Sequence, residues 1–312
     1  MIIYFVDTVH PILWDQLSKH KFQCVDATAY TKTAILEKAN EVEGIVIRSR
    51  FTLDETTLKK FPNLKFIARS GSGLENIDVA YCQKKGIKIF NSPEGNRTAV
   101  AEHAIGMLLS LFNNLKRGDE EVKLGIWRRE ENRGIEIEGK TIGIVGFGNT
   151  GEALAKRLQG FDCTILAYDK YKTGFGNNYV KQCTLSQIKK QADVLSFHVP
   201  YNEETHYYFN VHFLEGMAKP FYLINTSRGK VVKTDAVIEG IKSKKILGAC
   251  IDVLEFESSS FEKIDPSFKS ALSFLKEQDN VILSPHVAGW TSESYVKLSS
   301  VLADKILAAF NS

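Results

Sequence analysis

Short apolar runs alternate with amphipathic segments along the first part of the chain. Runs rich in Ile, Val and Phe, as in buried strands, cover residues 2–6, 22–25, 44–47, 64–68 and 87–90. Polar and apolar residues mix at helical spacing between them, at 13–20, 31–39 and 56–61. This alternation of strand and helix predicts a parallel sheet covered by helices.

A long apolar segment and a second strand series follow Pro93. Apolar residues at helical spacing predict one long helix over 98–123. A polar, partly helical insertion is expected at 258–279, and an apolar helix at 292–310. The later strands, six in number as in a full dinucleotide-binding sheet, are predicted at 141–145, 164–168, 194–198, 222–225, 248–253 and 281–283.

Composition places the chain among ordinary globular proteins. Hydrophobic residues make up 44% and charged residues 25% of its 312 residues, which suits two soluble domains. The net charge of +3 is small and Lys and Arg are not gathered in one block, so we expect neither nucleic acid nor a membrane as partner. The apolar runs are shorter than the roughly 20 residues of a membrane helix, and Met1 opens directly into a strand, so a cytoplasmic location is expected.

Cysteine and histidine positions favour neither a disulfide framework nor a metal site. The five cysteines are odd in number, widely separated and never in a C-x-x-C arrangement, so reduced thiols are expected. The histidines are scattered without ligand spacing, so no metal is expected.

A glycine-rich loop carries the most specific local signal. The sequence Gly146-Phe147-Gly148-Asn149-Thr150-Gly151 follows a predicted strand and opens a helical run at 152–158. The first glycine permits a tight turn, the second lets the backbone approach a pyrophosphate, and the third lets helix and strand pack closely. The helix N-terminus adds partial positive charge, so the loop predicts a dinucleotide site.

Asp169 ends the next strand, eighteen residues past Gly151. An acidic side chain there can accept hydrogen bonds from the adenosine ribose hydroxyls and would repel a 2′-phosphate, which favours NAD over NADP. Lys170 and Lys172 lie nearby and leave a mixed or reversed preference open, and Asp169 could instead be a simple cap beside a helix.

Three later segments supply groups suited to hydride transfer from a secondary alcohol. Segment 224–229 ends the fourth predicted strand of the second series, 252–257 follows the fifth, and 284–286 follows the sixth. Such a reaction needs a base for the hydroxyl proton and a cation for the substrate carboxylate. All three segments are expected at the carboxyl ends of parallel strands, where open α/β sheets bind ligands.

These motifs resemble the D-isomer-specific 2-hydroxyacid dehydrogenase family over essentially the whole chain. The resemblance implies an NAD-dependent oxidoreductase in which Arg228 grips the substrate carboxylate and carbonyl, His286 is the acid/base, and a glutamate holds and charges His286. A guanidinium suits the first role because it stays charged and binds a carboxylate with two prongs. The matching stretches are 68–78, 94–96, 101–103, 146–151, 225–229, 248–253 and 285–286.

The resemblance also implies further contacts. Substrate contacts are expected from Asn96 and from the backbone of Ser70, Gly71 and Ser72. Cofactor contacts are expected from Gly146, Gly148, Asn149, Thr150, Gly151, Asp169, Val199, Pro200, Thr226, Ser227, Asp252 and Gly289.

Two positions depart from the family pattern. A proline usually follows the catalytic glutamate, whereas Glu257 precedes Ser258 here, so Glu257 is preferred but Glu255 stays open as the partner of His286. Trp290 stands where the phosphoglycerate dehydrogenases more often carry a small polar residue, and it could cap the substrate pocket or pack between the domains.

The resemblance and the strand series together predict two doubly wound parallel-sheet α/β domains. We expect a flavodoxin-like substrate-binding (lid) domain from residues 1–92 with 290–312, and a Rossmann NAD-binding domain from 93–289. The apolar 98–123 region exceeds what one small domain hides, so a twofold homodimer through it is expected, with packing inside the monomer as the alternative.

The substrate class rests on Arg48-Ser49-Arg50, which follows a predicted strand. A similar segment binds the substrate phosphate in phosphoglycerate dehydrogenases, so the resemblance points to 3-phosphoglycerate, to serine biosynthesis, and to a short form without an amino-acid-sensing domain. Two solvated arginines are the plainer alternative. Glyoxylate, hydroxypyruvate or another 2-keto acid remains open as substrate, as does a non-catalytic NAD(H)-sensing, corepressor-like protein.

Overall fold

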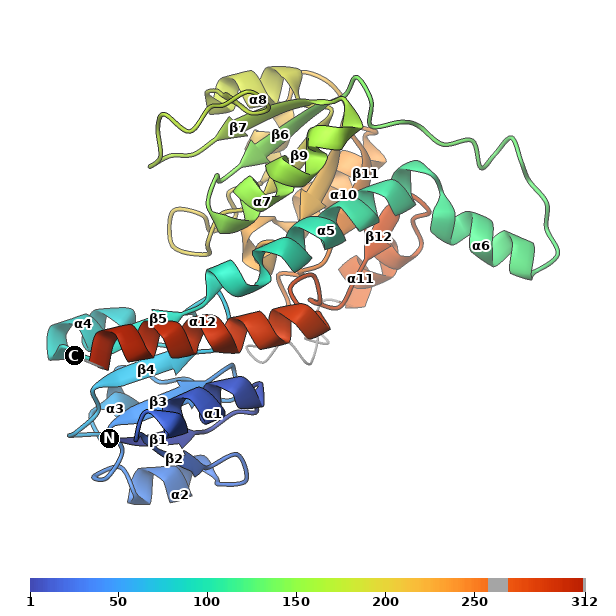
Figure 1. Ribbon diagram of the computed structural model, residues 1–312. Coiled ribbons are helices and arrows are strands. Elements are labelled where there is room, and N and C mark those ends of the chain that lie inside the picture. The colour runs from blue at the N-terminus through green and yellow to red at the C-terminus, as the bar shows by residue number, and fades with distance from the viewer. Residues whose placement is uncertain (258–268, 311–312) are drawn as a thin grey trace. The chain divides into compact units, whose positions relative to one another are not determined.

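The computed structural model describes residues 1–257 and 269–310, and the chain forms two compact units (Figure 1). The first contains Met1–Arg97 and Trp290–Ser312, and the second contains Thr98–Gly289. The division falls inside helix α5 (Pro93–Phe112). Of the predicted insertion at 258–279, residues 258–268 lie outside the described residues, and α11 (Lys269–Lys276) occupies most of the rest.

The first unit is a five-stranded parallel sheet in the order β2-β1-β3-β4-β5. This is the flavodoxin-like order, so the predicted fold of this part is confirmed. The strands are β1 (Ile2–Phe5), β2 (Gln23–Asp26), β3 (Gly44–Ile47), β4 (Phe66–Arg69) and β5 (Lys88–Asn91).

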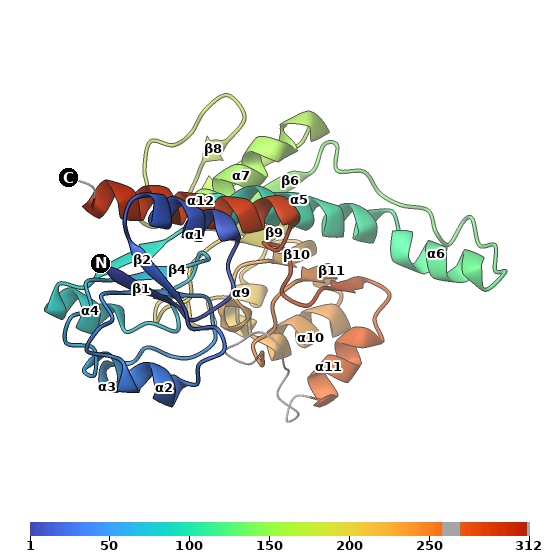
Figure 2. The ribbon, with the colours of Figure 1, turned by 60° about the horizontal axis from the view of Figure 1, so that its bottom comes forward.

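Helices cover both faces of this sheet because its strands are apolar on both sides. Side chains of α1 (Pro11–Lys19) and α12 (Ser292–Phe310) pack with Phe5, Val46 and Phe66 on one face. The two helices lie side by side (Figure 2). The other face packs against α2 (Lys32–Glu37), α3 (Glu55–Leu58) and α4 (Val79–Lys85).

The second unit is a seven-stranded parallel sheet in the order β12-β11-β10-β9-β6-β7-β8. The six predicted strands are present, and the two-residue β8 (Lys181–Gln182), too short to leave an apolar pattern, adds an edge. The others are β6 (Thr141–Val145), β7 (Thr164–Tyr168), β9 (Val194–Phe197), β10 (Phe221–Asn225), β11 (Ile246–Ile251) and β12 (Val281–Leu283).

Helices pack on both faces of the sheet of the second unit and give it a doubly wound architecture. Apart from α5 and α11, these helices are α7 (Asn149–Leu158), α8 (Leu185–Gln191), α9 (Val211–Glu215) and α10 (Thr234–Lys242), with short 3₁₀ turns at Gln159–Phe161 and Gly229–Val231.

The single long helix predicted over 98–123 is wrong. The apolar helix α5 ends at Phe112, and a separate helix α6 (Leu115–Lys123) follows. Asn114 interrupts them with a left-handed backbone, φ 51°, and its side-chain amide donates to the carbonyl of Arg133. Helix α6 has no buried residue and projects from the sheet of its unit in both ribbon views (Figures 1 and 2).

Membrane-spanning helices and clusters of metal-binding side chains are both absent from the described residues. None of the helices described is long and apolar enough to cross a bilayer. Residues 1–257 and 269–310 also contain no group of three or more His, Cys, Asp or Glu side chains that could hold a metal ion.

Candidate active site

The glycine loop between β6 and α7 is tightly folded on one side and open on the other. Gly146 has φ +94°, and a Cβ there would lie 2.6 Å from the carbonyl oxygen of His198. A Cβ on Gly151 would lie 2.1 Å from the Gly146 oxygen, so helix and turn touch at this point. A Cβ on Gly148 would meet nothing within 4 Å, and this open side is where a ligand can approach the backbone.

Asp169 ties the glycine loop to the segment after β7. Its Oδ2 accepts from the Phe147 amide at 2.7 Å, and its Oδ1 accepts from the amides of Tyr171 and Lys172, both at 2.9 Å. Burial alone would raise the pKa of Asp169, but these backbone hydrogen bonds outweigh it and hold the pKa below its ordinary value. The carboxylate therefore stays ionised beside the loop. Its contacts reach both the glycine loop and the segment after β7, whereas a simple helix cap would bond only the start of one helix.

The two lysines that left the nucleotide preference open are bonded within the protein. Lys172 Nζ donates to the carbonyl of Phe147 at 3.0 Å, and Lys170 Nζ contacts Glu204 at 2.7 Å. The Glu204 carboxylate raises the pKa of Lys170, so this ammonium is matched by a negative charge.

Arg228 follows β10 in a turn organised by Asn225. The Asn225 side chain accepts from the amide and hydroxyl of Ser227 and donates to the Arg228 carbonyl. The next residue, Gly229, packs so tightly that a Cβ would lie 2.0 Å from the carbonyl oxygen of Leu254, after β11. The segments that follow β10 and β11 are therefore in direct contact at the carboxyl edge of the sheet.

His286 follows β12 and is paired with Glu257. Its Nδ1 lies 2.6 Å from Glu257 Oε2, and the two side chains are 21% and 13% exposed. Glu255 points elsewhere, because its Oε1 accepts from the amide of Thr234 at the start of α10. Of the two glutamates, Glu257 is the one in contact with the imidazole.

The turn that carries His286 is held by Asp252. Ser284 Oγ and the amides of Val287 and Ala288 donate to its carboxylate, and its carbonyl accepts from the His286 amide at 2.8 Å. These contacts fix a left-handed His286 with φ 54°. Sequence reasoning gave Asp252 only a cofactor contact and missed this supporting role, which nothing local in the sequence signals.

His103 also joins this cluster. Its Nε2 lies 2.9 Å from Ser284 Oγ and 3.6 Å from Asp252 Oδ1. The sequence suggests only a packing role, because the histidine lies on an apolar helix and its polar partners follow strands far along the chain.

In the first unit, the segment after β4 forms a compact turn. Gly71 has φ +154°, and a Cβ there would overlap the guanidinium of Arg69, which sequence reasoning did not select. Ser72 Oγ donates to the side-chain oxygen of Asn96 at 2.7 Å, and Ser70 is buried. These predicted substrate residues therefore lie together.

The two arginines after β3 have different surroundings. Asp7 accepts from the backbone amides of residues 48–50 and fixes the turn. The Arg50 guanidinium donates to the carbonyls of Val6, Ala27 and Tyr30. The Arg48 guanidinium instead lies 4.3 Å from the ring centroid of Trp290. Trp290 is 49% exposed and packs against a cation of its own unit.

Comparison with known proteins identifies the family. The family model for the D-isomer specific 2-hydroxyacid dehydrogenase, NAD binding domain, matches residues 105–288, more than half of the chain. The chain belongs to this family. The predicted resemblance is therefore confirmed, and the second unit contains the family's NAD-binding domain.

The sequence and structure of the chain can be compared with those of individual members of the family. The chain is 32% identical to the D-3-phosphoglycerate dehydrogenase of Archaeoglobus fulgidus over 94% of its length, but it spans only 54% of that protein. It is 35% identical to the hydroxypyruvate reductase of Thermotoga maritima over 88% of its length and 87% of that protein's. A solved D-lactate dehydrogenase from Aquifex aeolicus, complexed with NAD and lactic acid, is 29% identical, with TM-score 0.83 over 100% of this chain and 96% of its own.

The residues of the NAD-binding domain fit a dinucleotide. The glycine loop is open at Gly148, and the ionised Asp169 lies beside it. Thr226 Oγ1 is buried and has no hydrogen-bond partner among the described residues, which suits an oxygen that serves a ligand. Val199 and Pro200 follow β9, Ser227 is buried after β10, and Gly289 ends this domain.

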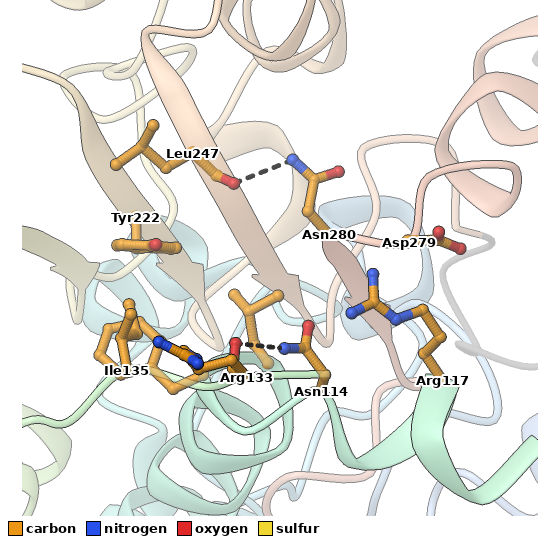
Figure 3. A pocket seen from close by; sticks show the side chains of 10 residues that line it. Asn114, Arg117, Arg133, Ile135, Tyr222, Leu247, Asp279 and Asn280 are labelled. Carbon is orange, nitrogen blue, oxygen red and sulfur yellow. Dashed lines mark hydrogen bonds between the residues drawn. The ribbon is translucent and has the colours of Figure 1, made fainter. Parts of the chain in front are cut away.

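A surface pocket of the NAD-binding domain lies at the opposite edge of its sheet (Figure 3). Tyr222 and Leu247 line it near the amino ends of β10 and β11, and Asn280 precedes β12. Arg228 and His286 instead follow the carboxyl ends of their strands. This pocket is therefore not the candidate active site.

Proposed function

We propose that the protein is an NAD-dependent dehydrogenase that interconverts a D-2-hydroxy acid and its 2-keto acid, and that its substrate pair is 3-phosphoglycerate and 3-phosphohydroxypyruvate. The observation that carries the activity is the Glu257–His286 pair at the carboxyl edge of an NAD-binding sheet, where the turn of Arg228 and Gly229 packs against the segment that leads to Glu257. The family supports the chemistry, and Arg48 supports the phosphorylated substrate.

Each residue has a distinct role in this proposal. NAD, held by the glycine loop and Asp169, would supply the hydride acceptor for oxidation of the alcohol carbon and, in its reduced form, the hydride donor for the keto carbon. Arg228 binds the substrate carboxylate and carbonyl oxygen, which a guanidinium can do with two donors at once. His286 takes the hydroxyl proton during oxidation and gives it back during reduction. Glu257 accepts from Nδ1 and would hold the imidazole in the orientation that this exchange needs.

The substrate phosphate is assigned to Arg48 rather than Arg50. Arg50 donates to three backbone carbonyls, so its guanidinium supports the turn. The Arg48 guanidinium lies over the ring of Trp290 and donates no hydrogen bond to another of the described residues, so its N–H groups are available to an oxyanion. Trp290 would then orient Arg48, a role that neither of the two alternatives from the sequence included.

Replacing Arg48 with glutamine is expected to raise KM for 3-phosphohydroxypyruvate by about tenfold or more and to leave kcat nearly unchanged. A remote phosphate contact contributes mostly ground-state binding, and one charge-assisted hydrogen bond is worth about 1.5–3 kcal/mol. Steady-state NADH oxidation measures both constants. Hydroxypyruvate, the same keto acid without the phosphate, is the control and should show no change. An equal rise in KM for both substrates would remove the phosphate assignment.

Reduction of an unphosphorylated 2-keto acid is the second candidate activity, because relatives of similar identity include a hydroxypyruvate reductase. A comparison of kcat/KM for 3-phosphohydroxypyruvate, hydroxypyruvate and glyoxylate decides between them. Turnover of none of these, with NADH bound, would instead favour the non-catalytic NAD(H)-sensing alternative. With the phosphorylated substrate, the reaction belongs to serine biosynthesis, and we propose the cytoplasm as its location.

We further propose a twofold homodimer that uses the 98–123 region. Helix α6 buries none of its residues within the chain, and Leu115, Val122 and Leu124 are exposed apolar side chains on and after it. Sedimentation equilibrium should give twice the 35.0 kDa chain mass. The pair Val122→Glu and Leu124→Glu should give the monomer mass with an unchanged circular dichroism spectrum, and a dimer that survives both changes excludes this surface.

A further inference from the structure

Three polar side chains connect the interior of the NAD-binding sheet to its glycine loop. Ser196 lies in the middle of β9 and is fully buried, and its Oγ is 2.8 Å from His198 Nε2. His198 directly follows β9 and is buried, and its Nδ1 is 3.2 Å from Thr150 Oγ1. Thr150 is the second residue of α7 and belongs to the glycine loop sequence. The three residues are here called the Ser196–His198–Thr150 relay.

The hydroxyl of Ser196 fixes the direction of these hydrogen bonds. Among the described residues, Nε2 of His198 is its only hydrogen-bond partner, and a buried hydroxyl hydrogen needs an acceptor. Ser196 therefore donates to Nε2, which must be unprotonated. In a neutral imidazole the other nitrogen then carries the hydrogen, so Nδ1 donates to Thr150 Oγ1. The opposite tautomer would leave the Ser196 hydrogen buried without an acceptor.

Burial keeps His198 in this neutral form. Desolvation lowers the pKa of His198 from 6.5 to about 4, so the imidazole is uncharged at neutral pH. A protonated ring would donate from both nitrogens and would leave the Ser196 hydroxyl without its acceptor. The direction of the relay is therefore stable across the physiological pH range.

The direction of these hydrogen bonds determines what the hydroxyl of Thr150 can do. Its oxygen already accepts from His198, and no acceptor for its own hydrogen is found among the described residues. Thr150 is half-buried and lies in the first turn of α7, where backbone amides and the helix dipole favour an anion. Its hydroxyl is thus prepared to donate to a phosphate oxygen.

We propose that the relay sets the Thr150 hydroxyl as a hydrogen-bond donor to the pyrophosphate of the bound dinucleotide. His198 contacts Thr150 and Ser196 contacts His198, so both act as positioning residues for the Thr150 hydroxyl. The proposal concerns only the dinucleotide that the family implies and is independent of which keto acid is reduced.

Equilibrium binding of NADH to the full chain, followed by its fluorescence, tests the contact of Thr150. Thr150→Val is expected to raise the dissociation constant by about tenfold, because a neutral-to-charged hydrogen bond is lost. Thr150→Ser keeps the hydroxyl and should stay within about twofold of the unchanged protein. ADP-ribose, which has the pyrophosphate but no nicotinamide, should lose the same factor with Thr150→Val. Unchanged NADH binding by Thr150→Val would overturn the proposal.

A double-mutant cycle tests the relay itself. Ser196→Ala frees the imidazole to take the other tautomer, and we expect the NADH dissociation constant to rise by about threefold or more. In the Thr150→Val background the same change should have no further effect. Equal effects of Ser196→Ala in both backgrounds would mean that the serine acts through general stability and would reject the relay. Ser299→Ala, which removes another fully buried serine hydroxyl from the first unit, is the matched control and should leave NADH binding unchanged.

Discussion

Replacing His286 with asparagine is expected to lower kcat for keto-acid reduction by about 10² to 10⁴-fold, because the variant has no group that can pass a proton to the forming alkoxide. Asparagine also tolerates the left-handed backbone that His286 adopts, so the turn held by Asp252 should persist. Stopped-flow measurement of a single turnover isolates the chemical step. NADH binding, measured separately, should be nearly unchanged, and a variant that retains wild-type turnover would exclude His286 as the acid.

The two nearby glutamates provide an internal comparison for the same assignment. Glu257→Gln keeps the size of the side chain in contact with Nδ1 but removes its charge, so kcat should fall by about 10-fold or more. Glu255→Gln changes a side chain that bonds the start of α10 and should leave kcat within about twofold. Equal losses in both variants would show that the charge on Glu257 has no special part in the proton transfer.

The architecture was predictable because it depends on patterns that repeat along the chain. Buried parallel strands are apolar on both faces, so runs such as those of β3 and β6 stand out as continuous Ile and Val segments. The glycine loop was equally clear, because its glycines relieve close contacts that any Cβ would create at Gly146 and Gly151. Both signals are local, so one sequence is enough to read them.

The predictions that were wrong, and the alternatives that the sequence left open, depend on contacts between segments far apart in the chain. Asn113 and Asn114 are a weak signal for a helix end, and the hydrogen bond that stabilises the break comes from Asn114 to the carbonyl of Arg133. Arg48 and Arg50 are alike in sequence, and their roles differ because Trp290 lies beside Arg48 whereas backbone carbonyls bind Arg50. Glu255 and Glu257 are distinguished only by where Thr234 and His286 lie. Local patterns therefore specify the elements, whereas the assignment of partners requires the fold.

Two glycine substitutions in the cofactor loop are expected to affect different properties, one the stability of the protein and the other its affinity for the cofactor. Gly151→Ala places a Cβ 2.1 Å from a backbone oxygen that no rotamer change can move, so the free energy of unfolding should fall by about 3 kcal/mol. Gly148→Ala meets no protein atom within 4 Å, so its unfolding should match that of the unchanged protein. The added methyl group instead occupies the space through which a pyrophosphate approaches the backbone, and NADH affinity should fall by about 10- to 100-fold.

Chemical denaturation and NADH titration of each variant measure the two effects separately. Gly160→Ala is the control for the substitution itself, because its Cβ also meets nothing within 4 Å and it lies outside the loop, in the turn after α7. It should change neither quantity. If Gly148→Ala bound NADH as tightly as Gly160→Ala does, the dinucleotide would not pass over this face of the loop. The open space at Gly148 would then not be the surface that binds the pyrophosphate, even though the fold is unchanged.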